Sequence, residues 1–556
     1  MGLPLFWLFI LAACLLWSAT FSAAAARSAR FPGLLSLAAW LIPVLLLVPA
    51  VALTRFLASG PKPYAANAFT AAVTLLLAAF IGGVWITIAG RQPSAHGTPV
   101  ARRWPVIGLA GLCGMAAMVA YGTLLAIDNA VTAEAVQARL EAAALIQANL
   151  PPAVADADNA APLHRQAAAL VAGDYTFKRA DFFSDLDESI DIRSPENAAL
   201  LARHANTLDL IRRAADKNAC RFDRDWSRPS IGMLLPEIRA LRDEARLLAL
   251  AARRAAADGD AAAAVADTVR IHRLACQADV EPIMISHLVS LGLDSLARNT
   301  LARVLPSLKA DDVALLDDPG LDGVVGPPPL PLKWMLGEEA LVLSVFADIA
   351  TGRMEIAEIA SWPGETIAYL VVDRFSLLYR TLFLRDELAA YRKALHERQE
   401  ICDHDEGWIS ALRRVRHRQD MTTNRESFFA IFDPSFQIVF EHQLEATAGA
   451  RAAQVLIAAT KRRLAGGGLP ESLDDLVPDQ LSAVPRDPYT DNKQPLRSKL
   501  ADGGIVVWWV GLNSEDDGGP TGHDSDSGEA RDYNDDFGLW LMPDRRSATP
   551  VEAAAE

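Results

Sequence analysis

Acidic residues are absent from the first 127 residues of this 556-residue chain, and the basic residues there are confined to short clusters. The formal net charge of the whole chain is −15, and its negative sign therefore comes from the part that follows. Phosphate binding requires a density of Lys and Arg that this acidic part lacks. Nucleic acid is consequently not an expected partner.

Established catalytic motifs are also missing. The sequence contains no Gly-rich phosphate loop, no nucleophile elbow and no HExxH pair. Glu338 and Glu339 are adjacent, and adjacent residues of a helix point in different directions, so they do not suggest a general acid–base pair. His272 and His287 are expected to pack or to cap helices. An enzymatic role is thus less favoured than a non-enzymatic one.

Cysteine is scarce, with five residues in the whole chain. Cys14 and Cys113 lie in apolar segments, where a thiol is expected to act as a packing residue. Cys220, Cys276 and Cys402 are widely spaced in the later part of the chain. A Cys220–Cys276 disulfide is possible in an oxidising compartment, and the sequence leaves this open.

Four stretches contain no Asp, Glu, Lys or Arg and are long enough to cross about 30 Å of hydrocarbon as helices. They consist mainly of Leu, Ala, Val, Ile and Phe, and Trp or Tyr near several ends suits the membrane interface. The first stretch lacks the basic segment of a cleaved signal peptide, so we expect it to remain as a span. The sequence therefore predicts a four-helix transmembrane anchor over residues 1–127, with spans Met1–Ala26, Phe31–Thr54, Pro63–Gly90 and Trp104–Ile127.

The basic residues between these stretches predict an orientation. Lys and Arg favour cytoplasmic loops, and the first and third loops together carry five of them, whereas the second carries two. The predicted location is the bacterial inner membrane, multi-pass, with the soluble region and both termini on the periplasmic side. No ionisable residue falls within a span, so the lipid bilayer is expected to hold an anchor and not a transport pathway.

From residue 128 onward the apolar spacing predicts helices. One strongly periodic helix stops at Asp258-Gly259-Asp260, where Gly259 can form the C-cap and Asp260 can cap the next helix. Such a pair resembles a tetratricopeptide-type hairpin, but no period of about 34 residues recurs, so an irregular helical bundle is predicted. The expected segments are a helical domain with this hairpin at 128–320, a Pro/Gly linker at 321–331 and a second helical part at 332–445.

The C-terminal region changes from helices to turns and strands. The sequence predicts a short helix at Asp474–Val477 and a rigid turn at Val484–Tyr489. A hairpin signal at Asp502-Gly503-Gly504 separates two predicted strands, and a third strand is expected at Phe537–Leu541. The fold class is therefore mainly α, with a transmembrane region, an extracytoplasmic helical bundle and a small α+β module with a short antiparallel sheet at 446–543. Residues 544–556 are expected to form a disordered tail.

This module resembles the C-terminal domain of the major pseudopilin of type II secretion. The residues that carry the resemblance are, in order, 469–478 (LPESLDDLVP), 485–489 (PRDPY) and 510–513 (VGLN), followed by acidic pairs. The resemblance implies a long helix, a hairpin and an acid-rich calcium loop. It covers only the last 85–100 residues, and the chain lacks the family's basic leader and methylated first helix. Pilus assembly is therefore not implied.

The acidic loop that follows the second strand supports a calcium site independently. Between Glu515 and Asp536 there are nine acidic residues and one basic residue, Arg531. They repel one another unless they are hydrated or neutralised. Ca²⁺ accepts six to eight oxygen ligands in irregular loops. The predicted ligands are Asp516, Asp517, Asp535 and Asp536, and a mobile hydrated loop is the alternative.

Three functions remain for this sequence. The first is a membrane-anchored extracytoplasmic protein that binds other proteins of the envelope or of secretion. The second is an envelope hydrolase that uses carboxylates of the helical domain. The third is a membrane sensor or a transporter component. The second would require two acids that face one pocket with separated pKa values.

Overall fold

The computed structural model describes the placement of part of the chain. The described residues are 104–171, 192–227, 229–230, 233, 235–328, 332–354, 384–403, 409–410, 412–413, 434–501, 503–520 and 536–542. The chain divides into two compact units. Unit 1 comprises Met1–Ala142, Leu341–Ala394 and Arg425–Ile431, and unit 2 comprises Ala143–Ala340, Leu395–Asn424 and Phe432–Glu556.

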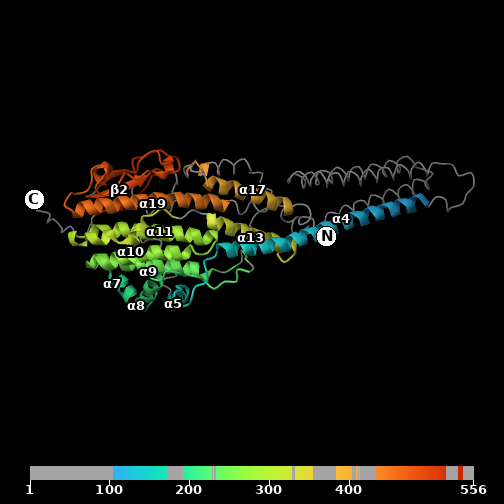
Figure 1. Ribbon diagram of the computed structural model, residues 1–556, viewed down its shortest axis with the longest axis horizontal. Helices are drawn as coiled ribbons and strands as arrows, with labels where there is room; N and C mark the ends of the chain where they lie inside the picture. Colours follow the sequence, from blue (N-terminus) through green and yellow to red (C-terminus); the bar gives the residue numbers. More distant parts are fainter. Residues whose placement is uncertain are drawn as a thin grey trace, which may run out of the picture. The chain divides into compact units, whose positions relative to one another are not determined.

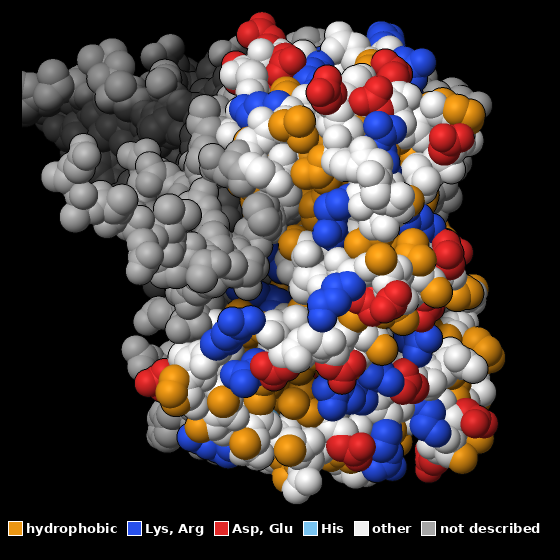
Figure 2. Space-filling view, turned by 90° about the vertical axis from the view of Figure 1, so that its left-hand side faces the viewer, with side chains coloured by type: hydrophobic (Ala, Val, Ile, Leu, Met, Phe, Trp, Pro, Cys, Tyr) orange, Lys and Arg blue, Asp and Glu red, His pale blue; other side chains and the backbone are white. Residues whose placement is uncertain are grey.

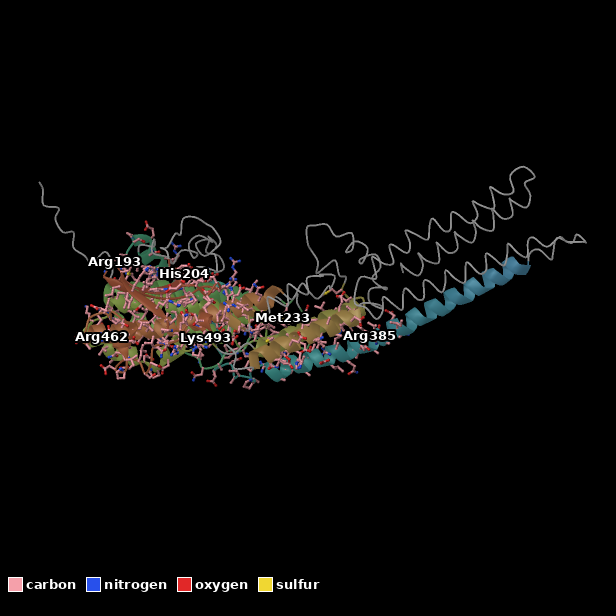
Figure 3. All side chains as sticks on the ribbon, turned by 90° about the horizontal axis from the view of Figure 1, so that it is seen from above. Arg193, His204, Met233, Arg385, Arg462 and Lys493 are labelled. Atoms are coloured by element: carbon pink, nitrogen blue, oxygen red, sulfur yellow. The ribbon has the colours of Figure 1, made fainter. Side chains whose placement is uncertain are left out.

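Ion pairs connect the helices of unit 1. Helix α4 (Trp104–Asn149) contributes Glu134 and Glu141, which pair with Arg385 and Arg392 of helix α17 (Leu384–Asp403). Arg385 is labelled in Figure 3, beside α4. Exposed pairs of this kind each contribute about 0–1 kcal/mol, so the pairs orient the helices more than they stabilise them. The buried face of α4 in this unit is formed by Val131, Ala135, Ala138 and Ala142.

Helix α4 corrects the membrane prediction. It begins at Trp104, where the fourth span was expected to begin, but it continues unbroken to Asn149 with charged residues along its second half. No helix in the described part of the chain is long and apolar enough to cross a membrane. The other three expected spans, 1–26, 31–54 and 63–90, lie outside the described residues.

This finding overturns the predicted four-helix transmembrane region, the multi-pass membrane class and the location in the bacterial inner membrane. The charge-free run Trp104–Ile127 is only the first part of a longer helix, whose second part carries Asp128, Glu134, Arg139 and Glu141. A charge-free run does not by itself define where a helix ends, so it did not establish a separate membrane span.

Unit 2 is built from packed helices and is, as expected, mainly helical. In Figure 1, α9, α10, α11 and α19 lie side by side in that order. Helices α5, α7 and α8 lie on the far side of α9 from α11, and α12 packs against α10 and α11. The bounds are α5 Ala161–Val171, α7 Pro195–Arg203, α8 Ala205–Ala215, α9 Pro236–Asp258, α10 Ala261–Ala278, α11 Met284–Val304, α12 Pro319–Val324 and α19 Pro434–Leu464. Helix α13 (Leu332–Ala350) belongs to both units, and short 3₁₀ turns occupy η2 (Leu305–Ser307) and η3 (Ala310–Asp317).

The turn between α9 and α10 forms as the sequence predicted. Gly259 has φ +83°, a left-handed conformation that caps α9 and that glycine adopts without steric cost. The Asp260 side chain accepts a hydrogen bond of 3.0 Å from the N–H of Ala263 and so caps α10. These two caps fix the antiparallel hairpin whose apolar faces form the core of the unit.

The C-terminal module is a three-stranded antiparallel sheet packed on α19 (Figure 1). The strands are β1 (Arg497–Ala501), β2 (Gly504–Trp509) and β3 (Phe537–Leu541), in the order β1-β2-β3. Leu500 pairs with Ile505 across the hairpin, and Val507 pairs with Leu539. Every residue of β2 is buried because this strand is central and lies over α19. The turns η5 (Leu473–Leu476) and η6 (Pro488–Thr490) also contact α19.

Asp487 is the polar centre of this module, although its side chain is completely buried. Its carboxylate accepts hydrogen bonds from the N–H of Tyr489 at 2.9 Å and of Val510 at 3.1 Å, and pairs with Arg497 at 2.9 Å. Burial raises the pKa of Asp487, and the two backbone hydrogen bonds oppose that rise. One carboxylate thus connects η6, β1 and the end of β2.

We predict that Asp487→Ala destabilises the module by about 3 kcal/mol, because it leaves the partly buried Arg497 without this partner. Chemical denaturation followed by Trp fluorescence measures the loss, since Trp508 and Trp509 lie on β2. Asp479→Ala, at an exposed position of the same module, is the matched control and should change the free energy of unfolding by less than about 0.5 kcal/mol. Equal effects of the two substitutions would contradict the central role of Asp487.

Candidate functional site

The acidic loop is held against the sheet by a carboxylate that approaches it from the start of β3. Asp536 Oδ2 accepts hydrogen bonds from the N–H of Asp517 at 2.9 Å and of Gly519 at 2.8 Å. Gly518 and Gly519 have φ values of +92° and +94°, which let the backbone turn both amides toward one acceptor. Asp536 is only 5% exposed, and its other oxygen, Oδ1, has no hydrogen-bond partner among the described residues.

Asp516 stands beside Asp536 in a different environment. One of its oxygens accepts hydrogen bonds of 3.1 Å from Trp508 Nε1 and from the N–H of Gly518. The other oxygen pairs with Arg497 Nε at 2.9 Å. Partial burial opposes ionisation, but these hydrogen bonds and the positive charge of Arg497 lower the pKa of Asp516. Asp516 is therefore an anion held in place by three donors.

The two carboxyl groups shift each other's pKa in opposite directions. A hydrogen bond from the Asp536 carboxyl, in its protonated form, helps to lower the pKa of Asp516. Burial raises the pKa of Asp536, against the hydrogen bond from Gly519, and the negative charge of Asp516 adds to the rise. An unpartnered buried carboxylate oxygen next to a fixed anion is costly unless a proton or a cation neutralises it. The loop therefore contains a position that favours positive charge.

The structure places the four predicted ligands in different ways. It brings Asp516 and Asp536 together, whereas the carboxylate of Asp517 is directed to Asn513 Nδ2 at 3.3 Å. Asp535 lies outside the described residues. Within the described ranges no group of three or more His, Cys, Asp or Glu side chains is arranged to hold a metal ion. A calcium ion at this position would thus take two side-chain carboxylates, and further ligands would have to be backbone carbonyl oxygens or water.

Lys499 and Arg497 limit the charge of the loop from the side of β1. Lys499 Nζ donates to the carbonyl of Gly518 at 2.8 Å and lies 5.5 Å from the centre of the Trp508 ring. Figure 2 shows acidic, basic and apolar side chains interspersed over one face of the molecule. Lys499 and Arg497 thus bring two positive charges to the described part of the acidic loop.

The helical part of unit 2 contains a second group of buried acids. Glu244 pairs with His164 at 2.6 Å, and the other ring nitrogen of His164 lies 2.8 Å from Gln277. Glu281 pairs with Arg224, which also binds Glu237 at 2.8 Å. Burial raises the pKa of both Glu244 and Glu281, and their basic partners oppose the rise.

Hydrolysis by two carboxylates needs one acid that stays protonated and one that stays ionised. Glu244 and Glu281 are shifted in the same direction, so they do not divide these roles. Each is instead paired with a basic side chain, Glu244 with His164 of α5 and Glu281 with Arg224. The buried acids are therefore interpreted as structural pairs.

Glu338 is a different case, because no basic side chain of the described residues pairs with its carboxylate. It accepts a hydrogen bond of 2.9 Å from the N–H of Met284 and caps the start of α11, while burial raises its pKa to about 7. An acid whose pKa is raised on folding stabilises the fold fully below its unfolded pKa and loses this contribution as the pH rises through the folded value. Stability should thus fall between about pH 4.5 and pH 7 through Glu338.

We predict that Glu338→Gln removes this pH dependence, because the amide still accepts the Met284 hydrogen bond and does not ionise. The variant should match the wild type at pH 4.5 and exceed its free energy of unfolding at pH 8 by on the order of 2 kcal/mol. Urea unfolding at the two pH values measures the difference. An unchanged pH dependence would show that Glu338 titrates normally in the folded protein.

The sequence interpretation missed a group formed by His272, Cys276 and Asp294. Cys276 Sγ lies 3.5 Å from His272 Nε2, and His272 Nδ1 lies 2.7 Å from Asp294 Oδ1. The signal was the four-residue spacing of His272 and Cys276, which places both on one face of a helix. Cys220 and Cys276 are both free, so the disulfide that the sequence left open is not formed.

Comparisons with known proteins do not identify relatives. No protein-family model matches the chain, and neither the curated proteins nor the solved structures that were searched gave a significant match.

Proposed function

We propose that this chain is a non-enzymatic protein-interaction component whose C-terminal loop binds calcium. The observation that carries the proposal is the unpartnered Oδ1 of the buried Asp536, which lies beside the ionised Asp516. A divalent cation there satisfies the orphaned oxygen and removes the repulsion between two carboxylates at once. Binding would fix the loop between β2 and β3 and so set the surface that a partner contacts.

The order of elements in the module supports its resemblance to the pseudopilin of type II secretion. Helix α19 is followed by η5, η6, a hairpin and an acidic segment that leads into β3. The motif PRDPY places Asp487 at the start of η6, where the carboxylate holds the β1 and β2 ends. A role in secretion is the partner class that this resemblance suggests, and it rests on the module alone.

Two further observations favour interaction over catalysis. Glu244 and Glu281 are each paired with a basic side chain, and burial raises the pKa of both, which is the pattern of structural pairs. The module also shares α19 with the helical layer, because α19 packs on α11 and carries the sheet. A partner that binds the module is thereby connected to the whole of unit 2 through one helix.

We predict that calcium stabilises the full-length protein. A free concentration about 100-fold above the dissociation constant should add about 2.7 kcal/mol, which appears as a higher melting temperature than in chelator. Asp536→Asn should abolish this calcium-dependent shift, because it removes a charged ligand at the orphaned oxygen. Asp479→Asn carries the same charge change at an exposed position of the module and should keep the shift.

Two results would contradict the calcium site. Identical melting temperatures in calcium and chelator would exclude it, and so would a calcium shift of equal size in Asp536→Asn. Magnesium at the same concentration is the specificity control, because Mg²⁺ requires near-octahedral geometry and fits an irregular loop poorly.

The interaction role has its own test. A C-terminally tagged full-length protein should retain specific partners in calcium, lose them in chelator, and lose them in Asp536→Asn while Asp479→Asn retains them. Mass spectrometry against an untagged control identifies what is bound. Binding of the same partners without calcium would show that the calcium loop does not control the interaction. The absence of any specific partner would contradict the interaction role itself.

A further inference from the structure

His272, Cys276 and Asp294 form a continuous polar line across two helices of unit 2. Cys276 and His272 are one turn apart on α10, and Asp294 lies on α11. The thiol contacts Nε2 of the imidazole at 3.5 Å, and Nδ1 contacts the carboxylate at 2.7 Å. Thiol, imidazole and carboxylate thus follow the order in which an imidazole accepts a proton from a nucleophile while a carboxylate orients the ring.

Packing holds the imidazole in place and leaves the thiol accessible. A Cβ added at Gly323 of α12 would lie 2.3 Å from His272 Nε2, so the backbone of α12 closely covers the ring. The Asp294 side chain is 8% exposed and that of His272 is 17% exposed, whereas Cys276 is exposed. The structure therefore combines a fixed imidazole with a thiol that small molecules can reach.

The charges around the ring favour its protonated form. Burial opposes this form, but hydrogen bonds to Asp294 and Cys276 and their negative charges raise the pKa of His272 to about 10. On α11 the buried Arg298 faces Asp294 and, beyond it, Glu445 of α19. On α10 the neighbouring Arg273 is paired with Asp216 at 2.8 Å. An imidazole that keeps its proton when the thiol releases one stabilises a thiolate.

We propose that Cys276 is a reactive thiolate site that takes small electrophiles of the hydroperoxide class. The thiolate is the nucleophilic form of cysteine, and accessible thiolates beside a cation are the ones that oxidants modify. An acyl substrate fits less well, because it requires free N–H donors for an oxyanion. The backbone around Cys276 lies inside α10, where the N–H groups are already bonded along the helix.

The reaction balances without any further cofactor. The sulfur attacks one oxygen of the hydroperoxide, an S–O bond forms and the O–O bond breaks. The sulfur loses two electrons and becomes a sulfenic acid, and the leaving oxygen takes the proton of His272 and departs as water or an alcohol. His272 thus supplies the proton that the leaving group needs and returns to its neutral form.

Because of the position of Cys276 in its helix, a thiolate there depends on stabilisation by His272. Cys276 is in the last turn of α10, and the partial negative charge of a helix C-terminus disfavours a thiolate. The adjacent imidazolium is therefore required to stabilise it. Cys220 provides the contrast within the same chain, because it is buried and its pKa is raised to about 12, first by burial and then by the charge of Glu281.

Alkylation of the reduced full-length protein by iodoacetamide tests the thiolate, with mass spectrometry to follow each cysteine. At pH 6.5 Cys276 should react at least about tenfold faster than a free peptide of the same local sequence, and Cys220 should not react. The advantage of Cys276 over the peptide should be largest at low pH, because the peptide thiol ionises only as the pH rises through about 8.5. A Cys276 profile that follows the peptide would overturn the proposal.

His272→Gln should return Cys276 to the rate of the free peptide, while Arg273→Gln, which removes a positive charge next to His272, should leave the rate within about twofold. Asp294→Asn should give an intermediate loss and serves as the second variant if circular dichroism shows that His272→Gln is misfolded. Hydrogen peroxide followed by dimedone, which labels sulfenic acids, should mark Cys276 and not Cys220. Fast alkylation without dimedone labelling would overturn the hydroperoxide class, and equal labelling in His272→Gln would overturn the role of the imidazole.

Discussion

Arg497 lies between two carboxylates, and the C-terminal module depends on this arrangement. On one side it pairs with the fully buried Asp487, and on the other it pairs with Asp516 in the acidic loop. The buried carboxylate is acceptable only because Arg497 and two backbone N–H groups satisfy it. The same guanidinium then fixes the first residue of the candidate cation site, so folding of the strands and organisation of the loop share one side chain.

The contact with Arg497 helps to explain why the pKa values of the neighbouring Asp516 and Asp536 are shifted in opposite directions. Asp516 is anchored as an anion by Arg497, Trp508 and Gly518, whereas Asp536 is buried and has one unpartnered oxygen within the described residues. Protonation of Asp536 and binding of a cation are alternative ways to satisfy that oxygen. Calcium affinity should therefore fall as the pH falls, because protons compete for the same carboxylate.

Sequence reasoning succeeded where local chemistry dictates structure. The Gly259 and Asp260 caps, the Gly503 turn with φ +79° and the strand Phe537–Leu541 follow from backbone conformation and from alternation of side chains, which are local properties. It failed for α4, because the charge-free run that predicted a separate span is continuous with a charged helical segment that extends to Asn149. Two of the predicted ligands, Asp516 and Asp536, do lie together. The carboxylate of Asp517 instead accepts a hydrogen bond from Asn513, which the number of acidic residues in the loop did not predict.

The group around Cys276 also depends on contacts between residues that are distant in sequence. The spacing of His272 and Cys276 was visible in the sequence, but packing on α11 and α12 supplies Asp294 and the close approach of Gly323. Partners that are distant in sequence cannot be inferred from one helix. Packing therefore decides which of the polar side chains on a helix become chemically connected.

Luminescence of bound terbium tests directly whether the acidic loop holds a calcium site. Terbium occupies calcium sites, and the indole of Trp508, 3.1 Å from Asp516, lies close enough to sensitise its emission. If the loop binds calcium, excitation of tryptophan should give sensitised terbium emission, and added calcium should displace the terbium and remove this emission. The emission should be lost in Asp536→Asn but not in Asp479→Asn. Emission that calcium does not displace, or that persists unchanged in Asp536→Asn, would contradict a calcium site at this loop.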